Sequence, residues 1–105
     1  MKYAYPAVFT PKEKGMYSVN FPDLESCYTC GENLAEALVM AEDVLAMTLY
    51  DYEKEEKTIP KPSNRTNIKL EEGEFINDIV ADTLYYHKRF NHKAVKKKLS
   101  IPEYI

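Results

Sequence analysis

The chain has 105 residues, enough for one domain and a short tail, with the 45% hydrophobic and 30% charged residues of an ordinary soluble protein. No apolar run approaches the roughly 20 residues of a membrane span, and the start lacks the apolar core of a signal peptide, so we expect a cytoplasmic protein without a membrane partner. Residues 1–57 carry five lysines and eleven acids, net −6, whereas residues 58–105 carry net +3. This split indicates two partners of opposite charge, or acids that only solvate an outer helix face.

Three short strands are predicted before the first helix, at residues 3–9, 16–21 and 26–30, from alternation of apolar and polar side chains. Pro6 removes a main-chain donor from the first strand, which favours an edge position or a bulge. Residues 11–15 are predicted to form a charged hairpin loop. Pro22 and Asp23 turn the chain toward the third strand.

A long amphipathic helix is predicted from about residue 34 to residue 55. Asn33 is a good N-cap, and Glu36 stands where its carboxylate reaches back to the Asn33 amide, as in a capping box. Mostly apolar side chains recur at steps of three, four and seven residues, which predicts one continuous stripe along a helix face that a sheet must cover. The stripe consists of Leu34, Ala37, Leu38, Ala41, Leu45, Thr48 and Tyr52. Two prolines within residues 58–63 are predicted to end the helix.

The second half of the chain is less regular. Residues 64–73 form a polar connector that has room for a brief strand at 68–70, and β-branched residues predict a fourth strand at 75–81. Residues 82–91 are either a short helix capped by Asp82 or an extended linker. Residues 95–101 alternate again, and Pro102 marks a first helical turn that the chain does not continue.

Cys27 and Cys30, together with His87 and His92, have the residue types of a zinc site. The gap between the two pairs far exceeds the usual 12–15 or so residues, and in a strand positions three apart point to opposite faces. We therefore expect two reduced thiols, no bound metal and no cofactor.

The order of these segments resembles that of HicB-type antitoxins from type II toxin–antitoxin systems. The match covers residues 1–63 and rests on Tyr5-Pro6-Ala7-Val8-Phe9, Phe21-Pro22-Asp23-Leu24, Cys27 through Gly31 leading to Glu36-Ala37, and Ile59-Pro60-Lys61-Pro62-Ser63. A weaker match over residues 95–105 resembles the opening strand of a ribbon-helix-helix DNA-binding arm.

The resemblance implies an α+β fold: a β-β-β-α-β partial RNase H-like, toxin-binding domain over residues 1–82, a linker over 83–94, and an incomplete ribbon-helix-helix arm over 95–105. It implies a non-catalytic antitoxin that neutralises a small basic HicA-type mRNA-cleaving toxin by covering its RNA-binding face. As the full-length protein, such an antitoxin also represses its own operon by binding DNA. The candidate toxin-binding residues are Glu32, Glu36, Glu42, Asp43 and Asp51, and the DNA-facing residues are Lys96, Lys98 and Ser100.

Since the helices expected after Pro102 are missing, we expect a truncated chain or an arm that has lost its function, with operator DNA bound weakly or not at all. A lone ribbon is marginal in water, so a homodimer or tetramer is expected. Two alternatives stay open: a plain oligomerisation module, and a metal-dependent RNase H-like nuclease. The acids available to such a nuclease are Asp23, Glu42 and Asp82, but Asp23 is better explained as a turn residue and Glu42 lies off the helix stripe.

Overall fold

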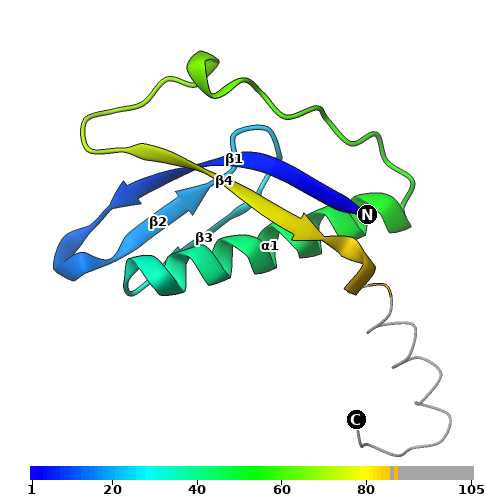
Figure 1. The fold of residues 1–105 in the computed structure, drawn as a ribbon, viewed down its shortest axis with the longest axis horizontal. Coiled ribbons are helices and arrows are strands. Elements are labelled where there is room, and N and C mark those ends of the chain that lie inside the picture. The colour runs from blue at the N-terminus through cyan, green and yellow to red at the C-terminus, as the bar shows by residue number, and fades with distance from the viewer. Residues whose placement is uncertain (86, 88–105) are drawn as a thin grey trace, which may run out of the picture.

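The computed structural model describes residues 1–85 and 87. They form one antiparallel four-stranded sheet with a long helix on one of its faces (Figure 1). The elements are β1 (Lys2–Pro11), η1 (Glu13–Gly15), β2 (Tyr17–Asn20), β3 (Tyr28–Gly31), α1 (Leu34–Lys54), η2 (Arg65–Asn67) and β4 (Phe75–Asp82). The predicted α+β class and the order β-β-β-α-β are confirmed.

The strand order is β3-β2-β1-β4, so β1 is central and β3 and β4 are the edges. β2 pairs with β1 only at Val8–Pro11, whereas β4 pairs with it over Lys2–Phe9. Pro6 lies in the half of β1 that has only β4 beside it. A residue without an N–H is tolerated there because this half of a central strand resembles an edge.

The boundaries of the later strands differ from the predicted ones. β3 begins at Tyr28 instead of residue 26, because Ser26 adopts a left-handed φ of 57° in the preceding turn. β4 continues to Asp82, one residue beyond the prediction. The brief strand predicted at residues 68–70 is wrong: this segment is irregular and pairs with no strand of the described sheet.

Gly31 allows β3 and α1 to approach each other closely. A Cβ at this position would lie 2.4 Å from the backbone nitrogen of Ala37 and 2.6 Å from its Cα. Both atoms belong to the helix backbone, so no side-chain movement relieves the overlap. Only glycine therefore fits here, and Ala37 is fully buried against the strand.

The core lies between the sheet and α1, where Tyr5, Ala7 and Phe9 of β1 are buried. The buried residues of α1 recur every fourth position: Ala37, Ala41, Leu45 and Leu49, with Ala46 beside them. The prediction was wrong for Leu34 and Leu38, which are exposed. A row of every fourth residue is inclined to the helix axis, so the buried face rotates along α1 where the helix crosses a twisted sheet.

The N-terminus of α1 is capped as predicted, but the second bond of the capping box differs. Asn33 Oδ1 accepts a 2.8 Å hydrogen bond from the Glu36 N–H, which confirms the N-cap. The Glu36 carboxylate accepts from the Glu32 N–H at 2.6 Å and not from the Asn33 amide. The backbone N–H groups of Glu32 and Glu36 are thus both satisfied, but the Glu36 carboxylate bonds one residue earlier in the chain than a capping box requires.

The C-terminus of α1 ends in a Schellman motif. The Lys57 N–H donates to the Tyr52 carbonyl at 2.9 Å, and the Glu56 N–H donates to the Glu53 carbonyl at 3.2 Å. Glu56 has the left-handed φ of 56° that this motif requires. The helix therefore ends at Lys54, ahead of the prolines that were predicted to end it.

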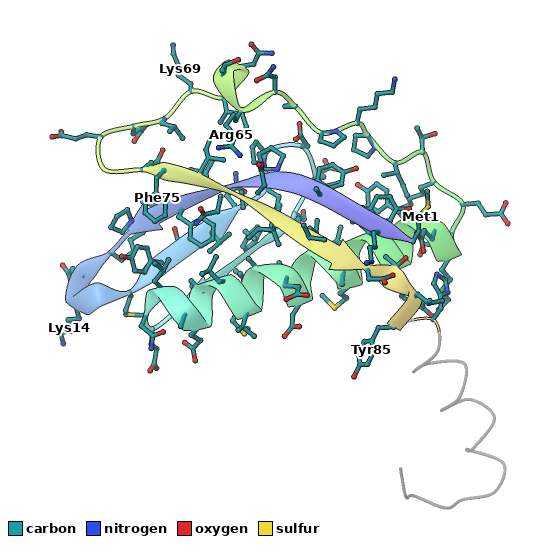
Figure 2. The ribbon with its side chains drawn as sticks, viewed as in Figure 1. Met1, Lys14, Arg65, Lys69, Phe75 and Tyr85 are labelled. Atoms are coloured by element: carbon teal, nitrogen blue, oxygen red, sulfur yellow. The ribbon has the colours of Figure 1, made fainter. Side chains whose placement is uncertain are left out.

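The crossover segment, residues 55–74, starts beside the core, where Ile59 packs and the Pro60 carbonyl accepts from the Tyr5 hydroxyl. It then passes to the face of the sheet opposite α1 (Figure 1). Arg65 points from this segment toward the sheet and forms an ion pair with Asp78 of β4 (Figure 2). Val8 on the same face is buried. The fold thus has three layers: α1, the sheet and the crossover segment. The side of α1 that faces away from the sheet is exposed to solvent.

Candidate protein-binding surface

The five acids predicted to contact a basic partner are all exposed and lie on α1 or just before it. No lysine or arginine occurs between Lys14 and Lys54, the stretch that builds β2, β3 and nearly all of α1. The charged residues in this stretch are Asp23, Glu25, Glu32, Glu36, Glu42, Asp43, Asp51 and Glu53. One part of the molecule is therefore predominantly negative, and the predicted residues belong to it.

One row of α1 side chains faces β3, and we call it the β3-side row. Residues three and four apart share a helix face, so the row consists of Glu36, Met40, Val44, Met47 and Asp51. Val44 packs against the core, and its carbonyl oxygen lies 3.9 Å from Sγ of Cys27, just before β3. Met40 and Met47 are 38% and 48% exposed. The row thus combines apolar and acidic side chains at the surface.

A second row, the β4-side row, lies on the other flank of α1 and consists of Leu38, Glu42, Ala46 and Tyr50. The Tyr50 ring packs edge-on against the ring of His87, with centroids 4.7 Å apart. Because His87 follows β4, this row faces the end of that strand. Glu42 and Asp51 therefore lie on different flanks, so the predicted acids do not form one surface; Glu32 precedes α1, and Asp43 belongs to neither row.

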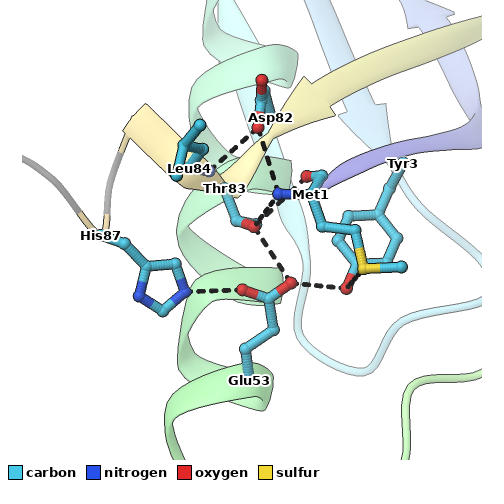
Figure 3. Close-up of polar contacts among 7 residues, drawn as sticks. All are labelled: Met1, Tyr3, Glu53, Asp82, Thr83, Leu84 and His87. Carbon is cyan, nitrogen blue, oxygen red and sulfur yellow. Dashed lines mark hydrogen bonds and ion pairs between the residues drawn. The ribbon is translucent and has the colours of Figure 1, made fainter.

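A polar junction at the end of α1 centres on Glu53, which the sequence did not single out. Its side chain is only 18% exposed. The carboxylate accepts hydrogen bonds from the Tyr3 hydroxyl at 2.5 Å and the Thr83 hydroxyl at 3.0 Å, and it lies 2.7 Å from Nε2 of His87 (Figure 3). The junction ties β1, α1 and the segment after β4 together. The one available signal was spacing, since Glu53 stands four residues after buried Leu49.

The junction shifts the pKa values of two of its groups. Burial alone would raise the pKa of the Glu53 carboxyl, but hydrogen bonds from Tyr3, His87 and Thr83 outweigh burial and lower that pKa below its usual value. Burial and the hydrogen bond to Glu53 raise the pKa of Tyr3 to about 12. Glu53 is thus held ionised and Tyr3 neutral, which suits a junction that positions chain segments.

Asp82 caps the turn that follows β4. Its Oδ1 accepts a 3.0 Å hydrogen bond from the Leu84 N–H and lies 3.3 Å from the Met1 amine. The backbone is helical from Thr83 to Tyr85. Of the two possibilities for residues 82–91, the described ones thus adopt the helix capped by Asp82.

The side chains considered for metal or nuclease chemistry have other surroundings. Cys27 is buried, which raises the pKa of its thiol, whereas Cys30 is exposed. Asp23 accepts a 2.9 Å hydrogen bond from the Ser63 N–H and so holds the crossover segment. Over residues 1–85 and 87, no three His, Cys, Asp or Glu side chains are arranged to hold a metal ion.

The remaining sequence predictions lie outside the described residues. These are His92, the domain boundaries beyond residue 87, and the DNA-facing Lys96, Lys98 and Ser100. They stay predictions. In the part of the chain that the structure describes, no helix has the length and apolar character needed to cross a membrane.

Comparison with known proteins places the chain in a family. The family model for the HicB-like antitoxin of bacterial toxin–antitoxin systems matches residues 4–76, so the chain belongs to the HicB-like antitoxin family. It is 39% identical over 59 residues to Antitoxin HicB of Escherichia coli (strain K12), covering 56% of this chain and 43% of that protein. It is 40% identical over 58 residues to Antitoxin HicB 1 of Photorhabdus laumondii subsp. laumondii, covering 55% of this chain and 37% of that protein. The chain thus spans less than half the length of these relatives.

Solved structures share the fold at lower identity. A chain of a toxin–antitoxin complex from Streptococcus pneumoniae superposes with a TM-score of 0.75 and 22% identity, covering 97% of this chain and 91% of that one. A chain of the HicA3 and HicB3 toxin–antitoxin complex superposes with a TM-score of 0.61 and 23% identity, covering 76% of this chain and 99% of that one. These likenesses show that the mixed α+β fold occurs in such complexes.

Proposed function

We propose that this chain is the toxin-binding part of an antitoxin, and that it neutralises a small basic HicA-type toxin by covering the face with which the toxin binds RNA. Membership of the HicB-like antitoxin family supports the class of function. The absence of lysine and arginine between Lys14 and Lys54 carries the choice of surface. Inhibition is then steric and electrostatic, and requires no catalysis by this chain.

The physical basis is competition for the same cations. A toxin that cleaves mRNA must attract phosphates with lysine or arginine, and those side chains are attracted equally by carboxylates. An acidic surface speeds the encounter, and apolar contacts beside it slow dissociation. The exposed acids of α1 and the adjacent methionines supply both kinds of contact.

We extend the proposal to the fold, the C-terminal arm and the assembly of the protein. Its domain is a partial RNase H-like fold, its C-terminal arm (beginning in this chain near residue 95) binds operator DNA, and two or four copies assemble through that arm in the cytoplasm. A plain oligomerisation module would share the assembly but would bind neither toxin nor operator.

Binding to the basic HicA-type protein encoded beside this gene tests the proposal. We expect a complex in titration calorimetry at low salt, with an affinity that falls about tenfold or more between 50 and 500 mM NaCl, because salt screens exposed charges. Lysozyme, an unrelated basic protein, is the control and should not bind. Absence of a complex at low salt would remove the proposal.

A further inference from the structure

We propose that the toxin adds a basic strand to the free edge of β3 and rests on the β3-side row of α1. This inference rests on the proposed function and narrows it to one surface. It excludes the other sheet edge, β4, and the β4-side row.

The described sheet offers two edges for strand addition, because β3 pairs only with β2 and β4 pairs only with β1. Each edge strand presents a row of main-chain N–H and C=O groups that a partner strand can pair with. β3 carries Tyr28, which is 67% exposed, and the exposed side chain of Cys30. Main-chain geometry alone permits either edge.

Charge favours β3. Both acids of β4 are paired with cations of this chain: Asp78 with Arg65, and Asp82 with the Met1 amine. β3 and the β3-side row come from the stretch between Lys14 and Lys54, which contributes acids and no lysine or arginine. Lys57 lies near Asp51, whereas the Glu36 carboxylate accepts its hydrogen bond from the neutral Glu32 N–H. A basic strand therefore finds more unneutralised negative charge beside β3 than beside β4.

Apolar side chains next to β3 supply the anchor. Met40 and Met47 flank half-buried Val44 on the helix face toward β3, and Tyr28 stands exposed on the strand itself. Methionine adapts its shape to a partner, and tyrosine contributes a large area at low entropic cost. A strand pairing with β3 would thus have apolar contacts beside it and an acid, Asp51, at the end of the row.

Matched substitutions on the two rows test the choice of surface. Met40→Ala combined with Met47→Ala should weaken toxin binding about tenfold or more. Leu38→Ala is the control: Leu38 is 37% exposed against 38% for Met40, but lies in the β4-side row, and its loss should change affinity less than about twofold. Asp51→Lys should likewise weaken binding about tenfold, and Glu42→Lys on the other flank should not.

Hydrogen exchange of backbone amides tests strand addition directly and without a mutation. On adding the toxin, exchange should slow at the amides of Tyr28–Gly31 that point away from β2, and the amides of Phe75–Asp82 that point away from β1 serve as the internal control. The free chain, measured at two concentrations, supplies the reference. If the β3 amides that point away from β2 already exchange slowly before the toxin is added, the edge is covered in the free protein, and the inference is overturned.

The outcomes separate this inference from the proposed function. If the wild-type chain binds no toxin, both fail. If it binds toxin but protection appears at β4, or the two rows respond equally to substitution, the proposed function stands and the β3 site is wrong. Protection at β3 together with selective loss of affinity in the β3-side variants is the expected result.

Discussion

Glu53 connects three parts of the molecule through one carboxylate. It stands at the end of the row of buried α1 residues, where a further apolar side chain would continue the core. Its partners Tyr3, Thr83 and His87 come from the start of β1 and from the segment after β4. The segment after β4 is therefore held by hydrogen bonds to Glu53, together with the ring contact between Tyr50 and His87.

Replacing Glu53 with alanine should destabilise the fold. The Tyr3 and Thr83 hydroxyls lose an acceptor in a half-buried place, which costs about 2 kcal/mol in the free energy of unfolding. Glu55→Ala is the matched control, because the Glu55 side chain is exposed and forms a surface ion pair with Lys57, so a loss of about 0.5 kcal/mol or less is expected. Urea unfolding measures both, and equal effects would contradict this role for Glu53.

The same comparison at acid pH checks the sign of the pKa shift. The pKa of Glu53 is lowered in the folded state, so its stabilisation is present above the ordinary value of 4.5 and is lost as the pH falls through the folded pKa. The stability difference between the wild-type chain and Glu53→Ala should therefore shrink below about pH 4.5. The lowered pKa values of Glu74 and Asp82 are common to both proteins and cancel. A gap that widens at acid pH would contradict the assignment.

At the scale of elements, α1 begins and ends by different means. Its start uses Asn33, a residue whose capping role is local and visible in the sequence. Its end uses Glu56 in the left-handed region, a position that usually belongs to glycine. The sequence therefore predicted the first boundary and gave the wrong cause for the second.

Glu56→Gly should stabilise the protein. Glycine adopts the left-handed conformation without the clash that costs other residues about 1–2 kcal/mol. Glycine also raises the conformational entropy of the unfolded chain, which offsets part of this, so the free energy of unfolding should rise by about 0.5–1 kcal/mol. Glu55→Gly is the control, since Glu55 has an ordinary φ of −92° and should lose stability on the same change. Thermal unfolding followed by circular dichroism compares the two. A loss of stability in both variants would refute the account of this helix end.

The sequence predicted the strands and the start of α1 because alternation and capping are local properties. It did not predict the rotation of the buried face of α1, which follows from the twist of a sheet assembled from distant segments. Glu53 was missed for a similar reason, since its partners Tyr3, Thr83 and His87 lie 50, 30 and 34 positions away in the sequence.

At the scale of the whole molecule, the charge split found in the sequence becomes a spatial one. The stretch between Lys14 and Lys54 forms two neighbouring strands and the helix beside them, so its acids share one part of the surface. Sequence identified these acids, but the division into two flanks depends on which strand lies beside each side of α1. Glu42 was therefore grouped with Asp51, although only Asp51 belongs to the β3-side row.

Protection of RNA is the most direct test of the claim that this chain acts by covering a toxin. A fixed amount of the neighbouring HicA-type toxin is incubated with RNA and increasing amounts of this chain, and intact RNA is measured on a gel. We predict that cleavage stops near a one-to-one ratio and that the chain alone leaves RNA intact with Mg²⁺ or Mn²⁺. Cleavage that continues in an excess of the chain, or RNA degraded by the chain itself, would contradict the account.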